Sequence, residues 1–65
     1  HPNVAIHRGN LGLAWASKGD YDKAIAYYEQ ALDILSKRLG RNHPNTETVA
    51  DNLKEARTKL LASKP

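Results

Sequence analysis

The sequence predicts an all-α fold, with three helices packed into one small domain. Apolar residues recur at three- and four-residue spacing, which is the helical period, and glycine and Asx residues divide the chain into three stretches. The chain also repeats part of itself at an offset of 42 residues. Because it has 65 residues, of which 40% are hydrophobic and 26% charged, it has room for one core and is too short for a multidomain enzyme.

The first helix is predicted over about residues 4–18. Asn3 stands where a side-chain oxygen can accept hydrogen bonds from the first free N–H groups of a helix. Gly19 follows the last turn, where it can adopt the left-handed conformation that ends a helix.

The second helix is predicted over about residues 21–39, and Asp20 opens it. Gly40 closes it behind Lys37 and Arg38, whose charges suit the partially negative end of a helix. The apolar stripe of this helix comprises Ala24, Tyr28, Ala31, Leu32, Leu35 and Leu39.

The third helix is predicted over about residues 46–62, with Asn45 as its cap. Its stripe comprises Val49, Leu53, Ala56 and Leu60. Short connections make neighbouring helices antiparallel, so the first two should form a hairpin on which the third packs. Gly12 and Ala24 stand where a large side chain would hold the hairpin open, and we expect leucine in place of Gly12 to overpack that contact.

The internal repeat divides the chain into one complete unit, residues 1–42, and the beginning of a second, residues 43–65. Six residues recur at the 42-residue offset, where about one or two matches are expected from ordinary residue frequencies. They are His1, Pro2, Asn3, Asn10, Leu11 and Ala14, which return as His43, Pro44, Asn45, Asn52, Leu53 and Ala56. Since the chain begins with His1 rather than Met, we interpret it as a piece of a longer protein or a processed product.

The run from Asn10 to Leu32, NLGLAWASKGDYDKAIAYYEQAL, resembles a tetratricopeptide repeat. The residues that carry the resemblance are Leu11, Gly12, Trp15, Gly19, Asp20, Tyr21, Ala24, Tyr28, Ala31 and Leu32. The long second helix, the ending LGRNHP and the 42-residue period are similar to the repeats of kinesin light chains, whereas the common unit has 34 residues. The resemblance implies a helical hairpin followed by a capping helix.

The predicted cap rests on two cations in the partial second unit. Lys54 and Arg57 stand in place of the residues equivalent to Gly12 and Trp15, so the third helix cannot accept the close partner that Gly12 accepts. We infer a terminal helix with its outer face in water, as arrays of repeats require at their ends.

In function, the resemblance implies a module that binds a peptide or protein partner in a concave groove lined by the first helix of each unit. The candidate partner-binding residues are Ile6, Gly9, Asn10, Leu13, Ala16, Ser17 and Asn52. Asn10 and its repeat Asn52 can form a two-rung ladder of amides for an extended peptide backbone. The alternative, to which we give more weight, is that each amide tethers a neighbouring segment of the scaffold.

Other chemistry lacks support in the sequence. His1, His7 and His43 do not share a helix face at four-residue spacing, there is no cysteine, and no serine has a paired base, so we expect no metal site, no cofactor and no enzymatic activity. The net charge of +3 is too small and too dispersed to indicate a nucleic acid, and no apolar run has the length of a membrane helix.

The predicted function is therefore a non-enzymatic interaction module or scaffold, which binds a protein partner or stacks on neighbouring repeats. The alternative is a structural unit without a peptide ligand, which forms homo-oligomers through its exposed N-terminal edge or by exchange of the third helix. The cysteine-free composition fits an intracellular, cytoplasmic location.

Overall fold

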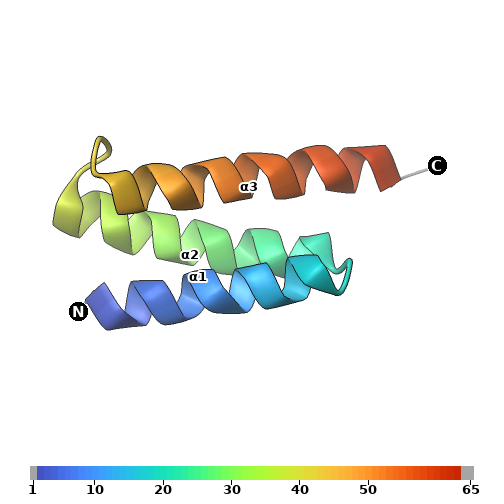
Figure 1. Ribbon diagram of the computed structural model, residues 1–65, viewed down its shortest axis with the longest axis horizontal. Coiled ribbons are helices and arrows are strands. Elements are labelled where there is room, and N and C mark those ends of the chain that lie inside the picture. The colour runs from blue at the N-terminus through green and yellow to red at the C-terminus, as the bar shows by residue number, and fades with distance from the viewer. Residues whose placement is uncertain (1, 64–65) are drawn as a thin grey trace.

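The computed structural model describes residues 2–63 and contains three α-helices, with no strand among these residues (Figure 1). The helices are α1 (Pro2–Ser17), α2 (Tyr21–Leu39) and α3 (Pro44–Ser63). The predicted all-α fold is thus confirmed. The boundaries of α2 are those expected from the sequence. α1 and α3 each begin two residues before the expected start, and α1 ends one residue earlier and α3 one residue later than expected.

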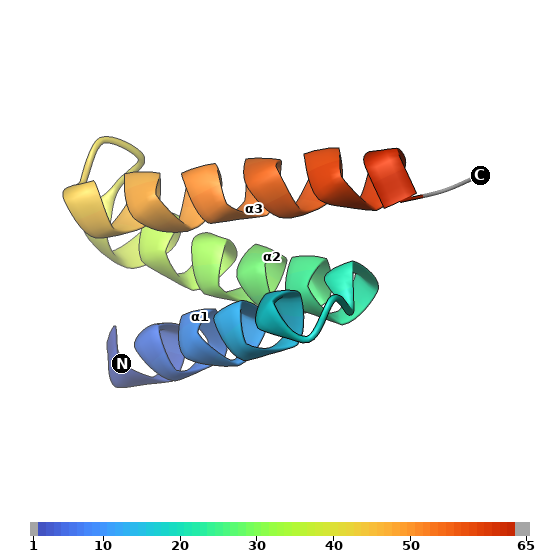
Figure 2. The same ribbon diagram turned by 45° about the vertical axis from the view of Figure 1, so that its right-hand side comes forward.

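The central helix is α2, which lies between α1 and α3 in both views (Figures 1 and 2). α1 and α2 form an antiparallel hairpin, and α3 packs on α2 while running in the same direction as α1. The resulting molecule is a flat, elongated stack that measures 38 × 19 × 13 Å along its principal axes.

Small residues make up much of the core between the helices. Ala5, Ala24 and Ala31 are fully buried. Tyr28, which is only 2% exposed, is the largest fully buried side chain among the described residues. Leu53 and Ala56 of α3 join Ala24 and Tyr28 of α2 in one apolar cluster. Because alanine and glycine hold little volume, the helix axes come close and the few large side chains fill the remaining space.

α1 approaches α2 closely at Gly12. A Cβ atom at this position would lie 2.7 Å from Cδ1 of Tyr28 and 3.2 Å from the backbone oxygen of Ala24. Both distances are shorter than ordinary van der Waals contact, and the tyrosine ring is held in the core. The close contact predicted at Gly12 is therefore present, with Tyr28 as the main neighbour.

The ends of α2 follow the local signals in the sequence. The Asp20 carboxylate accepts a hydrogen bond from the Lys23 N–H at 3.3 Å. Gly19 and Gly40 have φ angles of 86° and 87°, in the left-handed region that favours glycine. The Gly40 N–H donates to the Ser36 carbonyl at 3.2 Å, which satisfies one of the last free acceptors of the helix.

The predicted caps of α1 and α3 are wrong. α3 begins at Pro44, so Asn45 lies inside its first turn, and Nδ1 of His43 accepts the hydrogen bond from the Asn45 N–H at 3.1 Å. Proline suits the first helical position because it lacks an N–H and its φ is already helical. α1 likewise begins at Pro2, which places Asn3 within the helix, while the preceding residue, His1, lies outside the described residues.

The outer face of α3 has the character expected of a capping helix. Lys54 and Arg57 are both exposed, and Nη2 of Arg57 lies 2.9 Å from Oε2 of Glu29 on α2. This exposed ion pair joins the two helices along their outer seam. Long cations at these positions leave no room for a further helix to approach as closely as α2 approaches Gly12.

Candidate partner-binding groove

A groove lies between α1 and α3, and α2 forms its floor. It consists of two adjoining hollows, which share Leu13 of α1 and Asn52 of α3 in their walls. The groove exists because α1 and α3 both pack against α2 but hardly touch each other. We call this feature the α1–α3 groove.

The first hollow has a volume of about 280 Å³ and is mainly apolar. Ile6 and Leu13 are about half exposed, at 50% and 52%, although they are large hydrophobic side chains. Exposed apolar side chains that face a concavity mark binding sites more often than isolated ones do. The lining comprises Ala5, Ile6, Gly9, Asn10 and Leu13 of α1, Leu35 of α2, and Asn45, Thr48, Val49 and Asn52 of α3.

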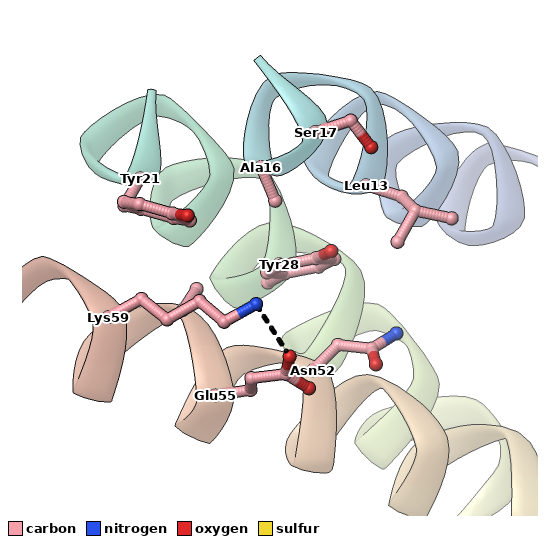
Figure 3. Close-up of a pocket in the computed structure, with 9 residues that line it drawn as sticks. Leu13, Ala16, Ser17, Tyr21, Tyr28, Asn52, Glu55 and Lys59 are labelled. Atoms are coloured by element: carbon pink, nitrogen blue, oxygen red, sulfur yellow. Dashed lines mark ion pairs between the residues drawn. The ribbon is translucent and has the colours of Figure 1, made fainter. Parts of the chain in front are cut away.

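The second hollow, of about 160 Å³, is more polar (Figure 3). Tyr21 and Tyr28 of α2 lie between the α1 wall and a Lys59–Glu55 ion pair on α3, whose Nζ and Oε1 atoms are 3.0 Å apart. Phenol, amide, carboxylate and ammonium groups therefore meet within one short stretch of the groove. The remaining lining residues are Leu13, Ala16 and Ser17 of α1 and Asn52 and Ala56 of α3.

Two pKa values in this hollow differ from their ordinary values. Burial raises the pKa of the Tyr28 phenol above 10.0, and the negative charge of Glu55 raises it further. The hydrogen bond and the charge of Glu55 raise the pKa of Lys59. At neutral pH Tyr28 is thus a neutral hydroxyl group and Lys59 a cation, so the hollow offers hydrogen-bond donors and acceptors without an activated nucleophile.

The structure brings the predicted binding residues together. Ile6, Gly9 and Asn10 line the apolar hollow, Ser17 lines the polar one, and Leu13 and Asn52 line both. Ala16 also lines the polar hollow. Residues from α1 and α3 that are far apart in the sequence thus share one groove.

The amides of Asn10 and Asn52 face the same apolar hollow. Asn10 is exposed and Asn52 half buried, and among the described residues neither side chain has a hydrogen-bond partner. The interpretation of these residues as tethers within the scaffold requires such partners. Neither amide therefore acts as a tether to another described residue, and the ladder stays a prediction.

Sequence analysis missed most of the α3 wall. Thr48, Glu55 and Lys59 lie in the groove, and each stands 42 residues after a residue of the α1 wall, namely Ile6, Leu13 and Ser17. The repeat itself was the signal that could have found them. Their identities differ from those of their equivalents, so the two walls differ in character: α1 is mostly apolar and α3 mostly polar.

The other candidates considered from the sequence lie apart from the groove. His7 is exposed on α1 and His43 caps α3, while His1 lies outside the described residues. Within residues 2–63, no group of three potential metal ligands comes together. None of the helices in this described part of the chain combines the length and the apolar character that crossing a bilayer requires.

Comparison with known proteins decides the family. A model of the tetratricopeptide repeat matches residues 3–60, which is most of the chain. The chain belongs to the tetratricopeptide repeat family. A search of curated proteins and a search of solved structures each gave no significant match.

Tetratricopeptide repeats are in general non-catalytic modules that bind other proteins. The matched residues include the hairpin, the tight Gly12 contact and most of α3. The predicted membership of this family is thereby confirmed.

Proposed function

We propose that this tetratricopeptide repeat chain is a non-enzymatic module that holds an extended segment of a protein partner in the α1–α3 groove. The observation that carries the proposal is the pairing of two unlike walls. Ile6 and Leu13 expose apolar surface on one side, and the amide of Asn52 stands opposite without an intramolecular partner among the described residues. An extended peptide needs both, because its side chains seek apolar contacts and its backbone seeks hydrogen bonds.

Asn10 and Asn52 fit the role of a two-rung ladder along such a peptide. Each amide offers a donor and an acceptor, as each backbone peptide unit does. If the ladder forms, Asn10→Ala weakens partner binding with little change in melting temperature. Unchanged affinity together with a lowered melting temperature would support the tether interpretation instead.

The test uses a displayed library of random peptides, because the partner is unidentified. Peptides selected on the wild-type chain are then measured against Leu13→Glu, which places a charge in both hollows. We expect a loss of affinity of at least about tenfold, which corresponds to about 1.4 kcal/mol.

Leu61→Glu is the matched control. Leu61 is an exposed leucine of α3, at 72%, that lines neither hollow. Selected peptides should bind this variant as they bind the wild type. Selection of no peptide, or of peptides that bind both variants equally, would contradict the proposed groove.

We also assign the chain to the 42-residue class of repeats that resembles those of kinesin light chains, with units at residues 1–42 and 43–65. The length of α2, which continues to Leu39, and the proline that begins α3 support this assignment. The cysteine-free composition supports a cytoplasmic location as part of the same proposal, since the chain needs no oxidising compartment.

A second candidate function is self-association, which is favoured by the exposed edge of α1. Val4, 45% exposed, lies there beside His7, Arg8 and Leu11 around a shallow hollow that also includes Tyr27. This surface is separate from the α1–α3 groove. Light scattering over a concentration series tests the candidate: a mass that grows with concentration supports it, and a strict monomer that still captures peptides supports the groove alone.

A further inference from the structure

Glu55 places a carboxylate in the polar hollow of the α1–α3 groove, and this carboxylate is only partly paired. Its Oε1 atom lies 3.0 Å from Nζ of Lys59, and no other described residue forms an ion pair or a hydrogen bond with the Glu55 side chain. The two side chains are 64% and 53% exposed. Because both oxygens of a carboxylate accept hydrogen bonds, Glu55 retains acceptor capacity for a bound molecule.

The α1 wall adds a partial negative charge from the other side of this hollow (Figure 3). Ala16 and Ser17 line the hollow from the last turn of α1, and that turn contains no basic residue. The carbonyl groups at the C-terminal end of a helix give it a partial negative charge, which acts over the last turn. The hollow therefore has negative charge in both of its walls.

Two tyrosines on the floor of the hollow also suit a cation. Tyr21 is half buried, and the face of an aromatic ring attracts ammonium and guanidinium groups. The neutral hydroxyl group of Tyr28 can accept a hydrogen bond. Burial and, after it, the negative charge of Glu55 raise the pKa of the Tyr28 phenol, so the field of the carboxylate reaches the floor of the hollow.

Lys59 is the only cation among the residues that line this hollow. The Nζ atoms of Lys18 and Lys23 lie 5.3 and 4.2 Å from the centre of the Trp15 ring, and none of these three residues is part of the lining. The basic end of α2 begins at Lys37, about 24 Å along the helix from its first residue, which lines the hollow. Charges this far apart are largely screened, because the Debye length at physiological ionic strength is about 8 Å.

We propose that the polar hollow binds a lysine or arginine side chain of the protein partner, while the apolar hollow binds an apolar side chain of the same segment. The inference rests on the proposed function and names the chemistry of the segment that the groove holds. Leu13 and Asn52 line both hollows, so one segment can pass through both. Two turns of the helical walls measure about 11 Å, which an extended chain covers in about three residues. The two side chains should therefore lie about two to four positions apart in the partner.

Lys59 competes only weakly with the cation of the partner. Its ion pair with Glu55 joins two exposed side chains on one face of α3, and such pairs contribute little stability. Removing the charge of Lys59 should therefore strengthen the binding of a basic segment. The same change should weaken the binding of an acidic segment, so its sign distinguishes the two kinds of partner.

The test uses peptides selected on the wild-type chain from a displayed random library and measures their dissociation constants by calorimetry. We expect the selected sequences to carry a lysine or arginine near an apolar residue. Glu55→Gln keeps the size of the side chain and should raise the dissociation constant at least about tenfold, whereas Lys59→Gln should lower it by a smaller factor. Glu29→Gln is the matched control, because Glu29 forms a similar exposed ion pair with Arg57 at 2.9 Å and lines neither hollow.

A change in the peptide tests the contact without altering the chain. A selected peptide whose lysine or arginine is replaced by glutamine should bind the wild type at least about tenfold more weakly, and Glu55→Gln should then have no further effect. Independent, additive effects of the two changes would overturn the proposed contact. This comparison also holds if Glu55→Gln alters the stability of α3, since the loss from the peptide change is measured on the wild type.

Ile6→Ala separates this inference from the proposed function. Ile6 lines the apolar hollow alone, and its replacement changes no charge. Peptides that Ile6→Ala weakens and Glu55→Gln leaves unchanged would retain the groove as a binding site and overturn its preference for a cation. Acidic peptides that Lys59→Gln weakens would do the same. Selection of no peptide, or of peptides that Ile6→Ala leaves unchanged, would overturn the groove and this inference together.

Discussion

At the scale of single residues, Gly12 and Thr46 differ in how the core around them is packed. Gly12 has no space for a Cβ atom, because Tyr28 and the Ala24 carbonyl already occupy it. Thr46 has the converse defect: it is 2% exposed, and within the described residues its hydroxyl has no hydrogen-bond partner. The core thus has no space for a further atom at Gly12, and at Thr46 it contains a hydroxyl group without a hydrogen bond to another described residue.

Replacing Gly12 with leucine should destabilise the hairpin. Forcing atoms into a packed core costs about 1–3 kcal/mol, and here the neighbouring Tyr28 ring is only 2% exposed. Urea unfolding followed by circular dichroism gives the change in free energy.

Gly9→Ala is the control for this substitution. Its Cβ atom would lie 3.9 Å from Cγ2 of Val49, an ordinary contact, so it should stabilise α1 by about 0.5–1 kcal/mol through helix propensity. Equal effects of the two substitutions would show that Gly12 is not a site of close approach.

Replacing Thr46 with valine should stabilise the chain by about 1–2 kcal/mol, because it removes an unsatisfied buried hydroxyl and keeps the shape of the side chain. Thr48→Val serves as the comparison, since the Thr48 hydroxyl donates to the Pro44 carbonyl at 2.9 Å and is exposed. Thermal unfolding of the two variants separates them. A lower melting temperature for Thr46→Val than for the wild type would mean that the hydroxyl has a partner in solution.

At the scale of helices, the ends of each element depend on a few polar side chains. Asp20 caps α2 from the position that the sequence indicates, whereas α3 uses the imidazole of His43 before Pro44. Imidazole nitrogen accepts a hydrogen bond as a carboxylate does, but histidine is not among the residues that sequence patterns associate with caps. The helix boundary moves by two residues as a result.

Removing the His43 cap should destabilise α3 and, with it, the whole stack. We expect His43→Ala to lower the free energy of unfolding by about 0.5–2 kcal/mol, the usual effect of losing a cap. His43→Asp should retain the stability, because a carboxylate accepts the same hydrogen bond and suits the positive end of the helix. Equal melting temperatures for the alanine and aspartate variants would argue against a capping role.

At the scale of the whole molecule, α2 serves three surfaces at once. Ala24 and Tyr28 of α2 contact α1 at Gly12 and also cluster with Leu53 and Ala56 of α3, and α2 forms the floor of the α1–α3 groove. A substitution in the buried part of α2 should therefore affect the α1–α2 hairpin, the packing of α3 and the α1–α3 groove together. Tyr28 takes part in all three.

The stability of the fold should decrease at alkaline pH in a way that depends on Tyr28. Its pKa in the folded chain is raised above 10.0, first by burial and then by Glu55, whereas the unfolded chain releases the proton near 10.0. The unfolded state is thus favoured as the pH rises above about 10, and this contribution to stability is lost as the pH passes through the folded pKa.

Urea unfolding at about pH 8 and about pH 11 measures this effect. Tyr28→Phe cannot ionise and should lose less stability than the wild type between these two values. The same loss in both chains would assign the alkaline effect to other groups.

Much of the fold could be read from the sequence because its causes are local. The bounds of α2, the two left-handed glycines and the apolar stripe follow from side-chain type and spacing within a few residues. The α1 residues Ile6, Asn10, Leu13 and Ser17 were expected from the resemblance to tetratricopeptide repeats, and the structure places them along the α1 wall of the groove.

What only the tertiary structure decided is which of two equivalent faces is covered and what stands across the groove. The same residue types recur in the same local pattern at Leu11 and Leu53 and at Ala14 and Ala56. Leu53 and Ala56 of α3 are buried, whereas on α1 Leu11 is half buried and Ala14 is exposed. Local sequence cannot distinguish the two faces, because burial depends on whether another helix packs on the face, and the fold of the whole chain decides that packing. The polar wall of Thr48, Glu55 and Lys59 has the same origin: it belongs to the groove because α3 packs on α2, which brings these residues opposite α1.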